Sequence, residues 1–271
     1  MSKNIGFIGC GNMAQAIIGG IVSSKFASPE NITASDISEK ALSSAAERFG
    51  INVSNNNKTA AENADVIVLA VKPQFFTDML ADIKPVLKKD VLIITIAAGI
   101  PVKFLEETLG TDTKIVRVMP NTAALVGESI TLICKNFIVT EEEFNYSVDL
   151  FNNVGKTEIV DEPMIDKALA IGGSSPAMVY MFIEAMADGA VLHGVPRDKA
   201  YKIAAQAVLG SAKMVLESGI HPGALKDMVC SPAGTTIEAV YTLEKNNFRG
   251  AVMGAIDSCT QKAINMSNSK K

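Results

Sequence analysis

The sequence predicts a two-domain protein in which an α/β domain, residues 1–162, precedes an all-α domain, residues 163–271. In the first part, short β-branched runs alternate with helical segments, which is the pattern of a doubly wound parallel sheet. After Asp161–Pro163 the β-rich character disappears, and residues 165–266 read almost entirely as helix. A chain of 271 residues is long enough for two ordinary domains with a substantial core.

The elements of the first part are predicted in the order of a βαβ fold. The expected strands are Ile5–Ile8, Ile32–Ser35, Val66–Ala70, Val91–Thr95, Lys114–Met119, Ser129–Ile133 and Thr157–Val160. The expected helices are Ser38–Phe49, Pro73–Leu87, Val102–Leu109 and Glu141–Phe151. In such a sheet the carboxyl ends of the strands meet along one edge, and ligands bind there.

The segment Lys3–Ala14 places a glycine-rich turn between the first expected strand and an apolar helix. Gly9 makes the tight turn, Gly11 lets the backbone approach a pyrophosphate, and Ala14 takes the third position, where helix and strand pack closely. The following helix N-terminus offers free amides and a partial positive charge to phosphates. This context predicts a Rossmann-type dinucleotide-binding domain, the alternative being a purely structural tight turn.

Asp36, at the end of the second expected strand, bears on which dinucleotide binds. An acidic residue there binds the ribose 2′-hydroxyl and repels a 2′-phosphate, which favours NAD. Its carboxylate can instead cap the following helix, leaving Ser35, Ser38 and Lys40 to face a 2′-phosphate. The spacing leaves both interpretations open, so the expected cofactor is NADPH or NADH.

Three loops follow neighbouring strands at the edge where a nicotinamide would pass. They are Ala70–Gln74, Ala97–Pro101 and Met119–Thr122. The alternative is that their prolines only start helices or turns, as prolines do anywhere. Three such loops at one edge favour the interpretation as a binding crevice.

The composition argues against several classes of protein. A net charge of −4 gives no electrostatic footprint for nucleic acid, so a small-molecule substrate is expected. The four cysteines show none of the C-x-x-C spacings of metal or redox sites, and no metal site is predicted. The first residues lack the pattern of a signal peptide, and no apolar run reaches about 18 residues, the length that spans a bilayer. We therefore expect a cytoplasmic protein with no membrane partner.

The segment Ala177–Leu192 is a helix that is apolar nearly all round. Glu184 and Asp188 interrupt it, and Pro176 and Gly194 are expected to confine it to fewer than about 18 residues, so burial is favoured over membrane spanning. The C-terminal part is too small to enclose such a helix alone. We therefore expect a homodimer through the C-terminal helices, either alone or as the unit of a larger oligomer of dimers.

The stretch Leu225–Lys245 carries the most specific chemical signal outside the glycine turn. Ser231–Gly234 is a predicted turn, and Thr235 or Thr236 begins a helix whose free amides can hold a carboxylate. This stretch resembles the signature of pyrroline-5-carboxylate reductases, which reduce a cyclic imine acid to proline with NADPH or NADH. The resemblance extends over essentially the whole chain, through Phe7–Ala14, Ala70–Gln74, Ala97–Ile100, Arg117–Asn121, Gly173–Val179 and Gly194–Arg197.

The resemblance implies reduction of 1-pyrroline-5-carboxylate to L-proline, the last step of proline biosynthesis. It implies that the substrate is bound by Ser231, Gly234, Thr235 and Thr236, with Thr236 as the catalytic residue beside the imine nitrogen. The alternative for these residues is an ordinary helix cap. The resemblance also implies cofactor contacts at Gly9, Gly11, Asn12, Met13, Asn57, Ala70, Lys72, Ala97 and Ala98. Ser35 and Asp36 at the second strand and Pro73 in the loop Ala70–Gln74 complete the expected cofactor residues. Because a protonated imine is already electrophilic, orientation is expected to dominate catalysis.

Two other functions remain open at this point. A hydroxy-acid dehydrogenase needs a general acid near the carbonyl, and Lys167 is the nearby candidate, without the asparagine-plus-lysine arrangement of such enzymes. A non-catalytic nucleotide sensor would bind the cofactor without turnover of an imine. The chain also departs from the commoner family pattern at Ser175, where glycine is usual, and at Gly189, where alanine is frequent.

Overall fold

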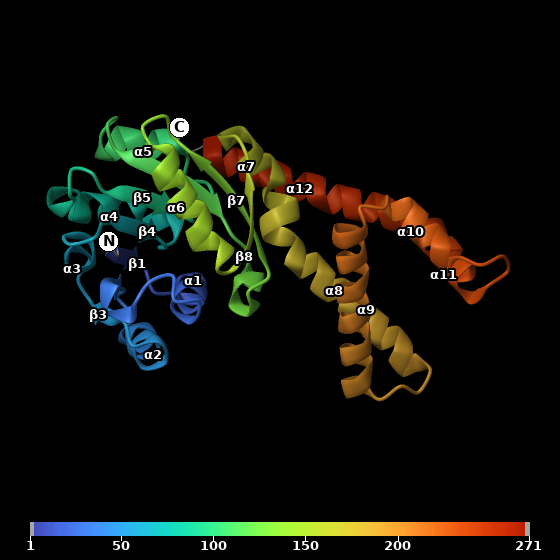
Figure 1. Cartoon of the computed structure of the whole chain (residues 1–271). Helices are drawn as coiled ribbons and strands as arrows, with labels where there is room; N and C mark the ends of the chain where they lie inside the picture. Colours follow the sequence, from blue (N-terminus) through green and yellow to red (C-terminus); the bar gives the residue numbers. More distant parts are fainter. Residues whose placement is uncertain (1–2, 269–271) are drawn as a thin grey trace. The chain divides into compact units, whose positions relative to one another are not determined.

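The computed structural model describes residues 3–268, and Figure 1 shows its elements along the chain. The chain forms two compact units. The first runs to Ser174 and takes up the chain again from Cys259, and the second is Ser175–Ser258. This division falls later in the chain than the boundary expected after residue 162, because the first helix of the expected C-terminal domain packs on the sheet.

The first unit is built on one sheet. In the described residues its strands are β1 (Ile5–Ile8), β2 (Ile32–Ser35), β3 (Asn52–Ser54), β4 (Val66–Leu69), β5 (Leu92–Thr95), β6 (Lys114–Met119), β7 (Ser129–Lys135) and β8 (Gly155–Ile159). Their order is β3-β2-β1-β4-β5-β6-β7-β8, and the first six strands in that order are parallel. This is the doubly wound arrangement of dinucleotide-binding domains, with its switch point between β1 and β4. The predicted fold class is therefore confirmed.

Two features of the sheet differ from the expectation. β7 runs antiparallel to β6, and β8 runs parallel to β7, so the sheet is not parallel throughout. The chain joins β6 to β7 through the short 3-10 helix η4 (Thr122–Val126), and parallel neighbours would need a longer crossover. The edge strand β3 was not expected, because it is short and its residues are polar or exposed.

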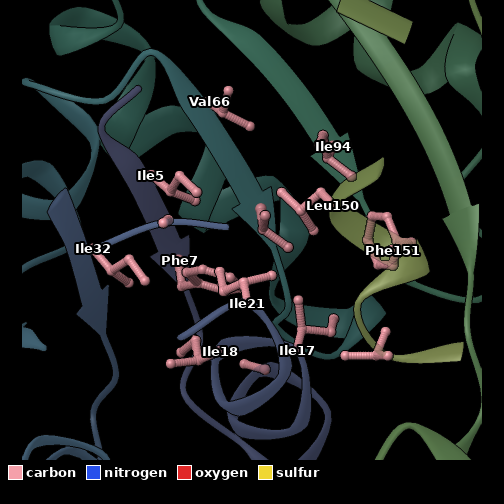
Figure 2. Packing of buried hydrophobic residues seen from close by; sticks show 14 of the residues in the cluster. Ile5, Phe7, Ile17, Ile18, Ile21, Ile32, Val66, Ile94, Leu150 and Phe151 are labelled. Atoms are coloured by element: carbon pink, nitrogen blue, oxygen red, sulfur yellow. The ribbon is translucent and has the colours of Figure 1, made fainter. Parts of the chain in front are cut away.

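Helices cover both faces of the sheet, because successive side chains of each strand point to opposite faces. Ile5 and Phe7 point to the face covered by α1 (Asn12–Ser23), α2 (Glu39–Phe49) and α6 (Glu141–Asn152). Figure 2 shows the packing on this face, with Phe7 of β1 beside Ile18 and Ile21 of α1. Ile8 points to the opposite face, which is covered by α3 (Asn57–Ala61), α4 (Phe76–Ile83) and α5 (Val102–Leu109).

Short 3-10 helices complete the first unit. The expected helix Pro73–Leu87 is α4 flanked by η2 (Pro73–Phe75) and η3 (Lys84–Val86), and η1 (Pro29–Asn31) precedes β2. Each of these three elements contains a proline in its first turn, where the missing N–H costs no hydrogen bond.

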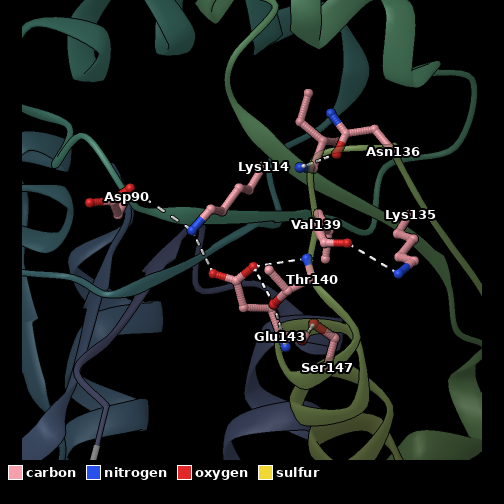
Figure 3. Close-up of polar contacts among 9 residues, drawn as sticks. Asp90, Lys114, Lys135, Asn136, Val139, Thr140, Glu143 and Ser147 are labelled. Carbon is pink, nitrogen blue, oxygen red and sulfur yellow. Dashed lines mark hydrogen bonds and ion pairs between the residues drawn. The ribbon is translucent and has the colours of Figure 1, made fainter.

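A polar network joins β6 to α6, as Figure 3 shows. Thr140 and Glu143 form a capping box at the start of α6, each side chain bonding the other's backbone N–H. The Glu143 carboxylate also accepts a hydrogen bond of 2.7 Å from Lys114 of β6. This network fixes the start of α6 against the sheet.

The chain then runs through α7 (Glu162–Leu169), the π-turn η5 (Ala170–Ser174) and α8 (Ser175–Leu192) as one helical path. Pro176 does not interrupt it, because it is the second residue of α8, directly after the π-turn, where a missing N–H costs little. The expected limit of fewer than about 18 residues is therefore wrong. By length and composition alone, the 31 residues Glu162–Leu192 are sufficient to cross a membrane, a property that core helices of soluble proteins share.

The second unit is helical, as predicted. After α8 it contains α9 (Arg197–Ser218), α10 (Pro222–Val229), α11 (Thr235–Lys245) and the first part of α12 (Phe248–Asn268). Within the single chain it buries little, since Met181 of α8 is 70% exposed and Leu216 of α9 is 84% exposed. Its buried apolar residues among those described are Ala187, Ala200 and Ala204.

Candidate cofactor and substrate sites

The glycine turn lies at the switch point of the sheet, between β1 and β4. Gly9 has φ of +99°, and its N–H donates to the Ser35 carbonyl at 2.8 Å. A Cβ at this position would lie 2.8 Å from the carbonyl carbon and oxygen of Ala70, so the turn and the chain leaving β4 are in close contact. Only glycine meets both requirements.

The N-terminus of α1 has space in front of it. Its N-cap residue, Gly11, makes no side-chain cap bond, and a Cβ on Gly11 would meet no atom within 4 Å. The first amides of the helix, at Asn12 and Met13, have no intrahelical partner. An open space facing free amides and a helix dipole fits a pyrophosphate, so this structure is suited to the predicted dinucleotide.

Asp36 holds the glycine turn through its side chain. Its Oδ2 accepts from the backbone N–H of Cys10 at 2.7 Å, and its Oδ1 accepts from the N–H of Ser38 at 2.8 Å. The N-cap of α2 is Ser38, whose Oγ accepts from the N–H of Ala41. The alternative in which Asp36 caps this helix is therefore wrong.

Ser35 is fully buried and acts on Asn57. Its hydroxyl donates to the Asn57 Oδ1 at 2.9 Å and lies 3.3 Å from the Phe7 carbonyl oxygen. The expectation that Ser35 faces a 2′-phosphate is wrong, because its hydroxyl lies within the core. Asn57 is the first residue of α3, and this bond brings it to the end of β2. The sequence offered no local signal for α3.

Cys10, within the glycine turn, is a buried thiol. Burial, together with the nearby Asp36 carboxylate, raises the pKa of Cys10 to about 11. Since the thiolate is the nucleophile, Cys10 remains a protonated, unreactive side chain near neutral pH. All four cysteines are free, with Cys10 and Cys134 buried and the other two half-buried.

The remaining expected cofactor residues follow β4 and β5. Lys72 is exposed and is the N-cap of η2, which begins at Pro73. Ala97 is buried, with its N–H donating to Thr95 Oγ1, and Ala98 is half-buried beside it. Because β1, β2, β4 and β5 are parallel, the structure brings all of the expected cofactor residues to the carboxyl edge of the sheet.

Asn121 lies in the expected crevice loop Met119–Thr122, although no role of its own was predicted for it. Its Nδ2 donates to the Gly172 carbonyl at 2.8 Å, and its Oδ1 accepts from the N–H of Ala123. Its backbone N–H donates to Ser129 Oγ. Asn121 therefore ties the loop after β6 to the π-turn η5.

Arg117 of β6 forms a buried charge cluster that was also not predicted. Its Nη1 lies 3.1 Å from Glu162 Oε1, and the same carboxylate oxygen accepts from the N–H of Val102 at 2.7 Å. Its Nη2 donates to Asp166. A charged side chain in the otherwise apolar segment Ile115–Met119 was the available signal.

The expected substrate turn lies in the second unit. The N–H of Gly234 donates to the Ser231 carbonyl at 3.0 Å, and Ala233 has φ of +57°. A Cβ on Gly234 would lie 2.3 Å from Ser231 Oγ, so glycine leaves the space that this hydroxyl occupies. The turn therefore places the Ser231 hydroxyl beside the start of α11.

The start of α11 bears on both interpretations of this turn. The helix begins at Thr235, as predicted, and its N-cap residue is Gly234, which has no side chain to bond the first amides. An ordinary helix cap with Gly234 as its N-cap residue therefore stays an alternative to substrate binding at this turn. The first-turn amides remain available to an anion beside the Ser231 and Thr236 hydroxyls.

Comparison with known proteins covers both parts of the chain. Residues 162–266 match the family model described as pyrroline-5-carboxylate reductase dimerisation, and residues 4–99 match that described as NADP oxidoreductase coenzyme F420-dependent. The pyrroline-5-carboxylate reductase of Escherichia coli (strain K12) is 50% identical over 269 residues, which cover 99% of this chain and 100% of that protein. The one from Methanosarcina acetivorans is 42% identical over 262 residues, 97% of each chain.

The solved structures give the same result. Plasmodium falciparum pyrroline carboxylate reductase with NADP bound superposes with a TM-score of 0.90 at 36% sequence identity, covering 98% of each chain. A structure from Coxiella burnetii also gives a TM-score of 0.90, at 33% identity over 98% of this chain and 99% of that one.

Proposed function

We propose, on the premise that this chain belongs to the pyrroline-5-carboxylate reductase family, that it reduces 1-pyrroline-5-carboxylate to L-proline with NADH or NADPH as the last step of proline biosynthesis. The observation that carries the proposal is the start of α11, where Gly234 leaves the first amides uncapped beside two hydroxyls. An anionic substrate fits this arrangement.

The first unit holds the cofactor in this proposal. The amides of Asn12 and Met13 bind the pyrophosphate across Gly9 and Gly11. Asp36 and Asn57 face the adenine ribose, with Ser35 acting through Asn57. The nicotinamide lies along the loops that follow β4 and β5, against Ala70, Lys72, Pro73, Ala97 and Ala98. When bound, the nicotinamide supplies a hydride.

The 163–271 part binds the substrate in this proposal. The backbone amides of Thr235 and Thr236 and the Ser231 hydroxyl hold the carboxylate, which the positive end of the α11 dipole also stabilises. Gly234 allows the close approach. The Thr236 hydroxyl then lies against the ring nitrogen and orients the C=N bond.

The reaction adds a hydride to the carbon of a protonated C=N bond, and the nitrogen keeps its proton as it becomes the secondary amine of proline. The protonated imine is already electrophilic, so the protein needs no strong acid or base. Thr236 acts as the catalytic residue by positioning the nitrogen. Two fixed ends, the carboxylate and the nitrogen, determine which ring carbon faces the hydride donor.

The active protein is a homodimer through the C-terminal helices, either alone or within a larger oligomer of dimers. Support comes from the exposed apolar side chains of α8 and α9, which a single chain leaves uncovered, and from the dimerisation family model. We place the protein in the cytoplasm, which its four free cysteines support, since free thiols persist in a reducing compartment.

Initial rates with 1-pyrroline-5-carboxylate and each reduced cofactor test the proposed function directly. We expect saturable oxidation of the cofactor with formation of proline. Tight cofactor binding without turnover of the imine would support a nucleotide sensor instead. Turnover of a 2-hydroxy acid that depends on Lys167 would support the dehydrogenase alternative.

A further inference from the structure

We propose that Asp36 makes this chain select NADH over NADPH, an inference that rests on the cofactor site proposed above. The side chain is fixed at both oxygens, since Oδ2 accepts from the Cys10 N–H at 2.7 Å and Oδ1 from the Ser38 N–H at 2.8 Å. Both donors are backbone groups, one in the glycine turn and one after β2. The carboxylate therefore cannot swing away from the ribose end of the crevice without breaking two hydrogen bonds.

The fixed carboxylate keeps accepting capacity for a ribose. An ionised carboxylate offers about four lone-pair sites, and the two backbone amides use two of them. The 2′- and 3′-hydroxyls of NADH are donors that can occupy the remaining sites. A 2′-phosphate presents acceptor oxygens and close to two negative charges at neutral pH, so it meets Asp36 as a like charge.

The chain that follows Asp36 does not offset this repulsion. Ile37 is 93% exposed and uncharged, at the position next to the carboxylate. Glu39 is exposed and adds a second negative charge, which the exposed Lys40 only balances. The segment 36–40 thus carries a net charge of −1, where a 2′-phosphate requires positive charge.

Two further cations of α2 and α3 already have partners. Lys58, at the start of α3, lies 3.3 Å from the Asp82 carboxylate. Arg48, near the end of α2, donates to Gln15 Oε1 at 3.1 Å. Phosphate recognition usually uses an arginine fork; Lys58 has none, and Arg48 already uses one of its donors on Gln15.

The test compares both cofactors in the full-length protein. We expect the wild-type kcat/KM to be higher with NADH than with NADPH by about tenfold or more. The equilibrium affinity, measured by fluorescence titration, should favour NADH by a similar factor. Tenfold corresponds to about 1.4 kcal/mol. Asp36→Asn removes the charge and keeps the shape, so the ratio should move toward NADPH by about tenfold. The wild-type preference should also narrow at high salt, because salt screens exposed charges.

A second variant covers the case in which Asp36→Asn disturbs the glycine turn. Ile37→Arg leaves both Asp36 hydrogen bonds in place and adds a cation, so it should increase NADPH affinity with NADH affinity near wild type. Glu47→Gln removes an exposed carboxylate at the other end of α2, and this control should leave the cofactor ratio unchanged.

Equal or better use of NADPH by the wild type, or an unchanged ratio in both variants, would overturn the selection by Asp36. Failure of the proposed function looks different. In that case NADH would still bind more tightly than NADPH, and neither cofactor would support reduction of the imine.

Discussion

Arg117 of β6 and Asp166 of α7 form an ion pair inside the protein, with Nη2 and Oδ1 2.5 Å apart. The arginine side chain is 1% exposed, and Glu162 lies on its other side. Because the pair joins the sheet to the first helix after it, it fixes the direction in which the chain leaves the sheet.

We predict that Arg117→Met lowers the free energy of unfolding by about 3–5 kcal/mol, because it leaves two carboxylates facing each other without their buried cation. Urea denaturation measures this change. Arg48→Met, which removes an exposed arginine, is the matched control and should cost much less. Equal losses in the two variants would contradict a structural role for the cluster.

Gly11→Asp should weaken cofactor binding by orders of magnitude. The new carboxylate would occupy the space in front of α1 and repel the pyrophosphate. Fluorescence titration with the reduced cofactor measures the affinity, and Ser43→Asp, an exposed position on α2, controls for the added charge. Wild-type affinity in Gly11→Asp would remove the proposed pyrophosphate site.

Thr236→Ala should reduce turnover of 1-pyrroline-5-carboxylate by roughly 10–1000-fold. The upper part of this range is the usual loss when a preorganised hydrogen-bond donor is removed. The lower limit is smaller because a water molecule can replace the Thr236 hydroxyl. Ser231→Ala should act mainly on KM, since its contact is equal in the ground and transition states. Cofactor affinity should barely change in either variant.

Thr242→Ala is the matched control for these two variants. Its hydroxyl lies on the same helix and donates to the Glu238 carbonyl, so its removal should leave the kinetics near wild type. If Thr236→Ala and Ser231→Ala both lose stability while kcat/KM is retained, the proposed substrate site is wrong.

Sedimentation should show a dimer, or a larger oligomer built of dimers. Met181→Asp, on the exposed face of α8, should weaken the association, because it would bury a charge in the interface. Phe137→Asp, at a fully exposed position of the first unit, should leave the association unchanged. A folded wild-type monomer at micromolar concentration would defeat the proposed dimer.

Glu143 should make stability depend on pH. Burial acts to raise the pKa of Glu143, but the hydrogen bonds from Lys114 and Thr140 outweigh it and hold this pKa below its usual 4.5. A carboxyl group with a lowered folded-state pKa stabilises the protein above its unfolded-state pKa, and this contribution is lost as the pH falls through the folded-state value.

Glu143→Gln should therefore lower the free energy of unfolding by about 1 kcal/mol at pH 7, and the difference from wild type should shrink below pH 4.5. Denaturation across this range measures it. Glu142→Gln, an exposed neighbour on α6, should show little effect at any pH. A difference that stays constant with pH would contradict the role of the ionised carboxylate.

The sequence predicted those elements of the fold that short residue spacings determine. The strand, glycine turn and helix around Gly9 and the start of α11 at Thr235 are encoded by short spacings, and the structure has them where expected. The antiparallel direction of β7 depends on how a short connection folds back, which hydrophobic periodicity does not contain. β3 has no buried alternating pattern, so it left no strand signal.

Some residues of the candidate site could be predicted from the sequence and others could not. The residues of the glycine turn and Asp36 follow from spacing, whereas Asn57 was reached only through the family resemblance. Its place depends on a buried hydrogen bond from Ser35, which no sequence pattern reveals. The roles of Asn121 and Arg117 likewise depend on partners about fifty residues away, such as Gly172 and Asp166.

The last part of α12 belongs to the first unit, and this has a consequence for how the protein is made. Thr260 Oγ1 donates to the Lys167 carbonyl, and Ala263 and Ser267 are buried. The Cβ of Met266 lies close to Gly99, in the loop after β5. During synthesis from the N-terminus, the Rossmann-type unit can complete its packing only after residues 259–268 have been made. A chain truncated before Cys259 would therefore contain every predicted cofactor residue but lack the last part of α12, which packs on the cofactor-binding unit.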